Sequence, residues 1–138
     1  MSALHKALLA SVADKGSRLR EVRKDLLRQK PGQTQRWFQG PDGCDLFLWY
    51  DERRGLSQIQ LTVEQRVVEW TLAEGLRTGR VVAFNPLRPL TDQSRLEFDA
   101  RPDGDALELA RVLLESAQGD ELTFMLVRKQ LGLIRKTD

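Results

Sequence analysis

The chain contains a single cysteine, Cys44, and a single histidine, His5, among its 138 residues. A structural zinc site needs four nitrogen or sulfur ligands, and a calcium loop needs oxygen ligands at alternate positions, so no local motif supplies either site. We therefore expect no bound metal and no other cofactor. The lone thiol also excludes an internal disulfide, which is typical of a reducing compartment, and we predict a cytoplasmic protein.

Long apolar runs are also missing from the sequence. No stretch approaches the ~18 consecutive apolar residues of a membrane-spanning helix, so we expect no integral membrane association. The opening "MSALHKALLASVAD" imitates a secretion signal, but its apolar run, Ala7 to Ala13, is short for one. The segments "DLFLWYDE" and "VVEW" suggest, in a general way, a small bacterial cytosolic protein, and they carry no functional motif.

Neither sign of charge dominates, because 22 basic residues nearly balance 20 acidic ones and leave a net charge of +2. Such a balance produces no strong overall field, so any argument for an anionic partner depends on where the charges lie. The apolar fraction of 41% is ordinary for a folded protein. The length matches the common size of one domain, and we predict a single α+β domain over residues 1–138.

The N-terminal part of the chain has the periodicity of a helix. Its apolar residues recur at spacings of four, four, seven, three and four: Leu4, Leu8, Val12, Leu19, Val22 and Leu26. This stripe predicts a long helix over residues 3–29, with a bend at Gly16 and an end before the "KPG" at residues 30–32.

From residue 35 to residue 98 the period changes to two, which is typical of strands. The alternation predicts strands at residues 36–39, 44–50, 56–63 and 67–72, another at 81–84, and a short edge strand at 95–99. The turn stretches "GPDG" and "DERRG" favour hairpins, whereas "EGLRTGR" is interpreted as a loop. The sequence therefore predicts an antiparallel meander of four to six strands.

Two further helices are expected over residues 104–136, with Asp103 and Asp120 as their N-caps and Gly119 between them. The order of elements is a helix, an antiparallel sheet and two helices. This order indicates an α+β fold in which a long N-terminal helix and two C-terminal helices pack on one face of the sheet.

Candidate chemistry is sparse. Cys44 at the start of a predicted central strand is interpreted as a small buried hydrophobe, because His5 is the only histidine that could activate it. Glu69 and Asp51 are the carboxylates considered for acid/base catalysis; Glu69 is expected on the wet face of the sheet, unless that face is covered. No two carboxylates have a spacing that places them across a substrate, so we predict no catalytic residue.

Charge is distributed unevenly along the chain. Residues 15–30 hold seven basic and two acidic side chains, a local net charge of +5, and residues 99–121 hold seven acidic and two basic ones, a net charge of −5. If the two segments face each other, they organise the monomer; if not, the basic helix is free to bind an anionic partner. The candidate binding residues, from this helix and from "EGLRTGR", are Arg18, Arg20, Arg23, Lys24, Arg28, Arg77 and Arg80.

These patterns favour a noncatalytic protein-interaction or regulatory module, whose first helix or exposed sheet face binds another protein or a second copy of the chain. The alternative is nucleic-acid binding through the basic helix, where phosphate contacts would dominate. A second alternative is a small enzyme with a carboxylate acid/base, which the absence of catalytic spacing disfavours.

Overall fold

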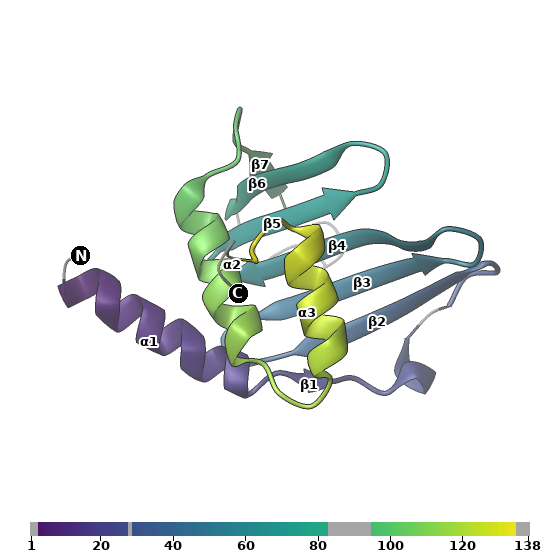
Figure 1. Ribbon diagram of the computed structural model, residues 1–138, viewed down its shortest axis with the longest axis horizontal. Helices are drawn as coiled ribbons and strands as arrows, with labels where there is room; N and C mark the ends of the chain where they lie inside the picture. The colour runs from purple at the N-terminus through teal and green to yellow at the C-terminus, as the bar shows by residue number, and fades with distance from the viewer. Residues whose placement is uncertain (1–2, 28, 83–94, 135–138) are drawn as a thin grey trace, which may run out of the picture.

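The computed structural model describes residues 3–27, 29–82 and 95–134. Its centre is one antiparallel sheet in which each strand pairs with the next in chain order (Figure 1). The strands are β1 (Arg20–Glu21), β2 (Gln33–Gln39), β3 (Asp45–Asp51), β4 (Gly55–Val63), β5 (Arg66–Thr71), β6 (Gly75–Val82) and β7 (Arg95–Phe98). The helices are α1 (Ala3–Ser17), α2 (Gly104–Ser116) and α3 (Glu121–Gln130). The predicted α+β class with an antiparallel meander is confirmed.

The sheet has seven strands rather than four to six. One reason is the two-residue strand β1, which is too short to show an alternation. The prediction of a loop at "EGLRTGR" is also wrong, because β6 already begins at Gly75. A Cβ atom at Gly79 would lie 2.4 Å from the carbonyl oxygen of Glu97, so this glycine permits the close approach of β7 instead of marking a turn. The predicted strand end at residues 83–84 lies outside the described residues.

The prediction of a helix over residues 3–29 is wrong, because α1 ends at Ser17. The chain then extends, and Arg20 and Glu21 pair with Gln39 and Phe38 of β2. Leu19, which continues the helical spacing of the sequence, is buried in the core from this extended segment. The spacing therefore persists past the helix end because both conformations place apolar side chains against the same core.

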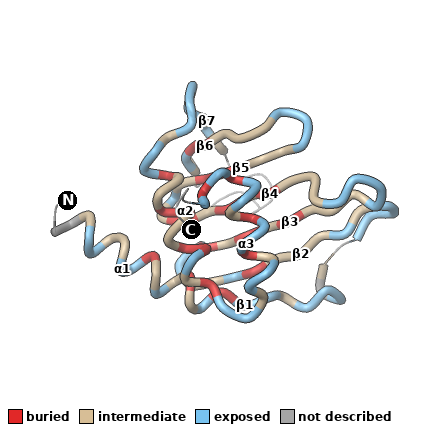
Figure 2. The backbone as a smooth tube through the Cα atoms, in the orientation of Figure 1, coloured by how far each residue is buried: buried red, intermediate tan, exposed pale blue. Residues whose placement is uncertain are grey.

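The core lies on one face of the sheet, where buried side chains alternate along the central strands. Leu46 and Leu48 of β3 are level with Leu61 and Ile59 of β4, and all four are fully buried. Helices α2 and α3 lie across this face, and Figure 2 shows buried segments gathered beneath them. Burial of these apolar surfaces supplies the main driving force for the two-layer arrangement.

Both C-terminal helices begin at the predicted caps. The Asp103 carboxylate accepts a hydrogen bond from the backbone N–H of Ala106, and the Asp120 carboxylate accepts one from the backbone N–H of Thr123. Helix α3 packs inward through Phe124, whose ring meets that of Phe38 edge to face at a centroid distance of 5.1 Å. Among the described residues, none of the helices is both long and apolar enough to cross a lipid bilayer.

A side chain covers part of the edge of β2. The Oε1 atom of Gln29 accepts a hydrogen bond from the backbone N–H of Gln35 at 2.9 Å, and its Nε2 donates to the carbonyl oxygen of Gln35 at 3.3 Å. A neighbouring strand would satisfy the same two backbone groups. The Gln29 amide therefore takes the place of a strand beyond the short β1.

Gly16→Ala should destabilise the fold by roughly 1–3 kcal/mol, the usual range for overpacking. The physical reason is that a Cβ atom at Gly16 would lie 2.3 Å from the carbonyl oxygen of Leu113 and would separate α1 from α2. Urea denaturation measures the difference. Gly104→Ala is the control, because nothing lies within 4 Å of a Cβ there. Equal stability of the two variants would show that α1 and α2 do not pack as described.

Candidate interaction surface

The thiol of Cys44 is a core group. Cys44 is only 1% exposed, and this burial raises the pKa of the thiol to about 12. A nucleophilic cysteine needs a lowered pKa and an accessible sulfur, and Cys44 has neither. Among the residues that the structure describes, no cluster of histidine, cysteine and carboxylate side chains could hold a metal ion.

Glu69 is buried at 4% exposure, so the expectation that it lies on a wet face is wrong. Both carboxylate oxygens are bound: Oε1 accepts from the Nε of Arg77 at 2.8 Å and Oε2 accepts from the Nε2 of Gln60 at 3.0 Å. The guanidinium of Arg77 also lies 3.6 Å from the ring centroid of Phe98. Glu69 therefore completes a cross-strand network on the side of the sheet away from the core.

Asp51, the second carboxylate considered for acid/base catalysis, organises a turn. Its Oδ1 accepts hydrogen bonds from the backbone N–H groups of Arg53 and Arg54, at 2.8 and 3.1 Å. This is the local bonding that aspartate commonly makes in turns. Both carboxylates thus have structural partners, which disfavours the enzyme alternative.

The basic residues predicted on one helix are spread over several elements. Arg18 follows α1 and pairs with Asp14 at 3.6 Å, while the guanidinium of Arg20 on β1 donates to carbonyl oxygens of the preceding turn. Arg23 precedes a short 3-10 helix (Lys24–Leu26) and pairs with Asp25 at 2.5 Å. Lys24 is exposed on that turn, and residue 28 lies outside the described residues. These side chains form a loose basic border around β1.

Arg77 and Arg80 do not join that border. Both lie on β6, which is separated from β1 by four strands of the sheet. Arg77 is bound by Glu69, as described above, whereas Arg80 is exposed opposite Glu97 of β7 in the register. The predicted binding residues that the structure describes therefore do not make one continuous patch.

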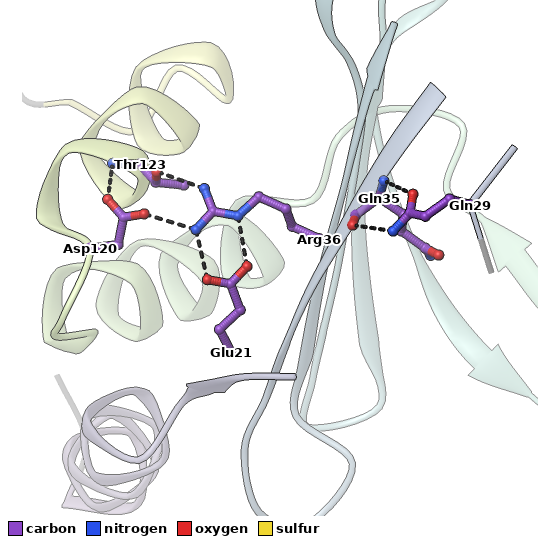
Figure 3. A network of polar contacts seen from close by, with 6 residues as sticks. All are labelled: Glu21, Gln29, Gln35, Arg36, Asp120 and Thr123. Atoms are coloured by element: carbon purple, nitrogen blue, oxygen red, sulfur yellow. Dashed lines mark hydrogen bonds and ion pairs between the residues drawn. The ribbon is translucent and has the colours of Figure 1, made fainter. Parts of the chain in front are cut away.

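Arg36, which the sequence did not single out, connects three elements (Figure 3). From β2 its Nε and Nη2 donate to the two carboxylate oxygens of Glu21 on β1, at 2.8 and 2.9 Å. Nη2 also donates to Asp120, at 2.8 Å, and Nη1 donates to the hydroxyl of Thr123, at 3.1 Å. The hydrogen bonds from Arg36 lower the pKa of both carboxyl groups below their usual values. This ion-pair network fixes the start of α3 on the sheet.

Helix α3 is apolar on two sides. Phe124 and Val127 are buried against the core, whereas Leu122, Met125 and Leu126 are 64%, 41% and 48% exposed. Positions i, i+3 and i+4 of a helix share one face, so these three side chains form a single outward stripe. Large apolar side chains that are exposed singly are normal on a protein surface, whereas a grouped set is a candidate interaction surface. We call Leu122, Met125 and Leu126 the α3 stripe.

The sequence contained a signal for this stripe. The run "LTFMLV" has apolar side chains at five of six positions, more than one face of a docked helix can bury. Comparisons of the chain with protein-family models, with curated proteins and with solved structures find no match. The geometry of the α3 stripe and of its support is therefore the basis for a functional argument.

Arg36→Met should destabilise the protein at neutral pH by roughly 2 kcal/mol, as expected for hydrogen bonds between charged groups. The pKa values of Glu21 and Asp120 are lowered in the fold, so their contribution is present above the unfolded values, ~3.9 for Asp and ~4.3 for Glu. It is lost as the pH falls through the lower, folded-state values.

Urea denaturation of both proteins between neutral pH and strong acid checks this prediction, because the stability difference should shrink on acidification. Arg23→Met removes an exposed arginine and should cost less than about 1 kcal/mol. A constant difference between the Arg36 variant and the unsubstituted protein at all pH values would contradict the assigned ion pairs.

Cys44 should be unreactive toward dithionitrobenzoate in the folded protein at mildly alkaline pH, because the sulfur is buried and its pKa is raised. The same thiol should react completely once the chain is unfolded in urea. Absorbance of the released thiolate measures both rates. Rapid reaction of the native protein would contradict the burial of Cys44 and reopen the question of a functional thiol.

Proposed function

We propose that the protein is a noncatalytic interaction module that binds another protein through the α3 stripe. The observation that carries this proposal is the grouping of three exposed apolar side chains, Leu122, Met125 and Leu126, on one face of a docked helix. Full burial of a leucine or methionine side chain is worth about 1.5–3 kcal/mol, so covering the stripe offers a partner substantial binding energy.

The contacts that hold α3 against the rest of the protein strengthen this interpretation. Phe124 and Val127 anchor the helix in the core, and the Arg36 network holds its first turn. A surface that is already ordered avoids much of the entropic cost that binding imposes on flexible segments. An apolar groove or a helix of the partner is the surface that suits a stripe with spacing i, i+3 and i+4.

The basic border around β1 supports nucleic-acid binding as the alternative. The acidic segment does not neutralise this border, because its Asp103 and Asp120 pair with Arg66 and Arg36 of the sheet. The arginines of the border make only local ion pairs at the surface, Arg18 with Asp14 and Arg23 with Asp25. The exposed border is therefore accessible to phosphates. Affinity for nucleic acid would fall steeply with salt, whereas affinity through the apolar stripe would depend on salt much less.

The combined substitution Leu122→Gln, Met125→Gln and Leu126→Gln should abolish partner binding and leave the fold intact, because these side chains face solvent. The measurement is affinity capture of the tagged protein from a native lysate, with and without nuclease treatment. We expect a stoichiometric protein that survives nuclease and is lost with the triple variant.

Leu72→Gln is the matched control, since Leu72 is 49% exposed but lies outside α3, directly after β5. This variant should capture the same partner as the unsubstituted protein. Capture that disappears with nuclease would favour the nucleic-acid alternative, and equal capture by the triple variant would refute a role for the α3 stripe.

A further inference from the structure

Among the described residues, the buried Nε of Arg128 on α3 lacks a hydrogen-bond partner, unlike the guanidinium groups of other half-buried arginines. Arg36, Arg66 and Arg111 are each held by carboxylates. Arg128 is also half-buried, yet its Nε is the one buried side-chain nitrogen or oxygen without a hydrogen-bond partner among the described residues. An unsatisfied buried donor costs free energy, and a charged one costs more than a neutral one. The Nε is inaccessible to solvent in this structure, so an acceptor supplied from outside removes that cost once the Arg128 side chain turns toward the acceptor.

Arg128 lines a groove between the three helices. The groove has a volume of about 610 Å³, which is within the range of ligand-binding clefts. Its lining includes Ala13 and Ser17 of α1, Leu114 of α2 and Phe124 of α3. The groove surface is mostly polar, because Leu114 and Phe124 are almost fully buried, and it places a cation next to the helix that carries the α3 stripe.

The charges around the groove restrict what it can accept. Glu115 is another lining residue, but both its carboxylate oxygens already accept hydrogen bonds from Arg111, at 2.9 and 3.0 Å. Glu121 lies seven residues before Arg128, about 10 Å along the helix. The C-terminal end of α2 adds the negative end of its dipole. These negative groups would repel a dianion more strongly than a single negative charge. A singly charged, planar acceptor also matches the geometry of the Arg128 guanidinium.

We propose that this groove binds a carboxylate of a partner protein, an acidic side chain in an extended segment, through the guanidinium of Arg128. The inference rests on the proposed function in one respect, that the carboxylate is presented by a protein. The distance between Arg128 and Glu121 corresponds to about three residues of extended chain. Arg128 therefore selects for an acidic side chain over a neutral one.

The test is an NMR titration of the full chain that observes the Nε–H resonance of Arg128. The probes are the peptides acetyl-Ala-Glu-Ala-amide, acetyl-Ala-Gln-Ala-amide and acetyl-Ala-Ala-Ala with a free carboxyl terminus, and inorganic phosphate. We expect the Glu peptide to shift the Arg128 Nε–H resonance and the backbone amides of residues 117–121, and the Gln peptide to shift neither. A stronger response to the free carboxyl terminus would overturn the assignment to a side chain.

Variants give the second arm of the experiment. Arg128→Met should weaken binding of the Glu peptide by about tenfold or more, as expected for loss of a charge-assisted hydrogen bond. Arg54→Met, which removes an exposed arginine from the turn between β3 and β4, should leave it unchanged. No movement of the Arg128 resonance with the Glu peptide, or tighter binding of phosphate, would overturn the proposal.

The test of the groove can be separated from the test of the α3 stripe. The variant with glutamine at positions 122, 125 and 126 retains Arg128 and the groove, so it should still bind the Glu peptide. Binding of the peptide without capture of any partner would overturn only the proposed function. Capture of a partner that is equally strong with Arg128→Met, together with a silent resonance, would overturn only this inference.

Discussion

The guanidinium of Arg36 joins three parts of the chain that are distant in sequence: its own strand β2, Glu21 on β1, and Asp120 with Thr123 at the start of α3. Apolar contacts beneath α2 and α3 are non-directional and favour any arrangement that excludes water. Charged hydrogen bonds have defined lengths and directions, so they select one position among those arrangements. The short strand β1 and the first turn of α3 therefore depend on the same side chain.

This constraint explains how a helix of ten residues can present apolar side chains to water. An isolated helix of this length is marginal, and α3 is stabilised by tertiary contacts on its inner side and by the ion pairs at its start. Its outer side is consequently free from any structural role in the monomer. The proposed binding surface would combine a rigid apolar stripe, which supplies binding energy, with a groove in which the Nε of Arg128 has no partner among the described residues, which supplies selectivity.

The sequence predicted the elements whose signals are local. Alternation located β4, a run of large apolar side chains located β3, and the positions of Asp103 and Asp120 identified them as caps. The end of α1 could not be predicted, because Leu19 continues the helical spacing while lying in an extended segment. The burial of Glu69 depends on the strand register that sets it opposite Arg77, and register is a tertiary property. For the candidate site, the sequence signal was the excess of apolar residues in α3, and the predicted binding residues did not include it.

The amide of Gln29, which occupies the backbone groups of Gln35, bears on how molecules of this protein meet at high concentration (Figure 3). Exposed strand edges are templates for edge-to-edge pairing and fibrous aggregation. Beyond β1, whose two residues pair only with Gln39 and Phe38, the Gln29 amide blocks the same register for an incoming strand. The first edge of the sheet is thereby partly covered, and the grouped apolar side chains that the described residues expose lie on a helix, where they cannot pair as a strand.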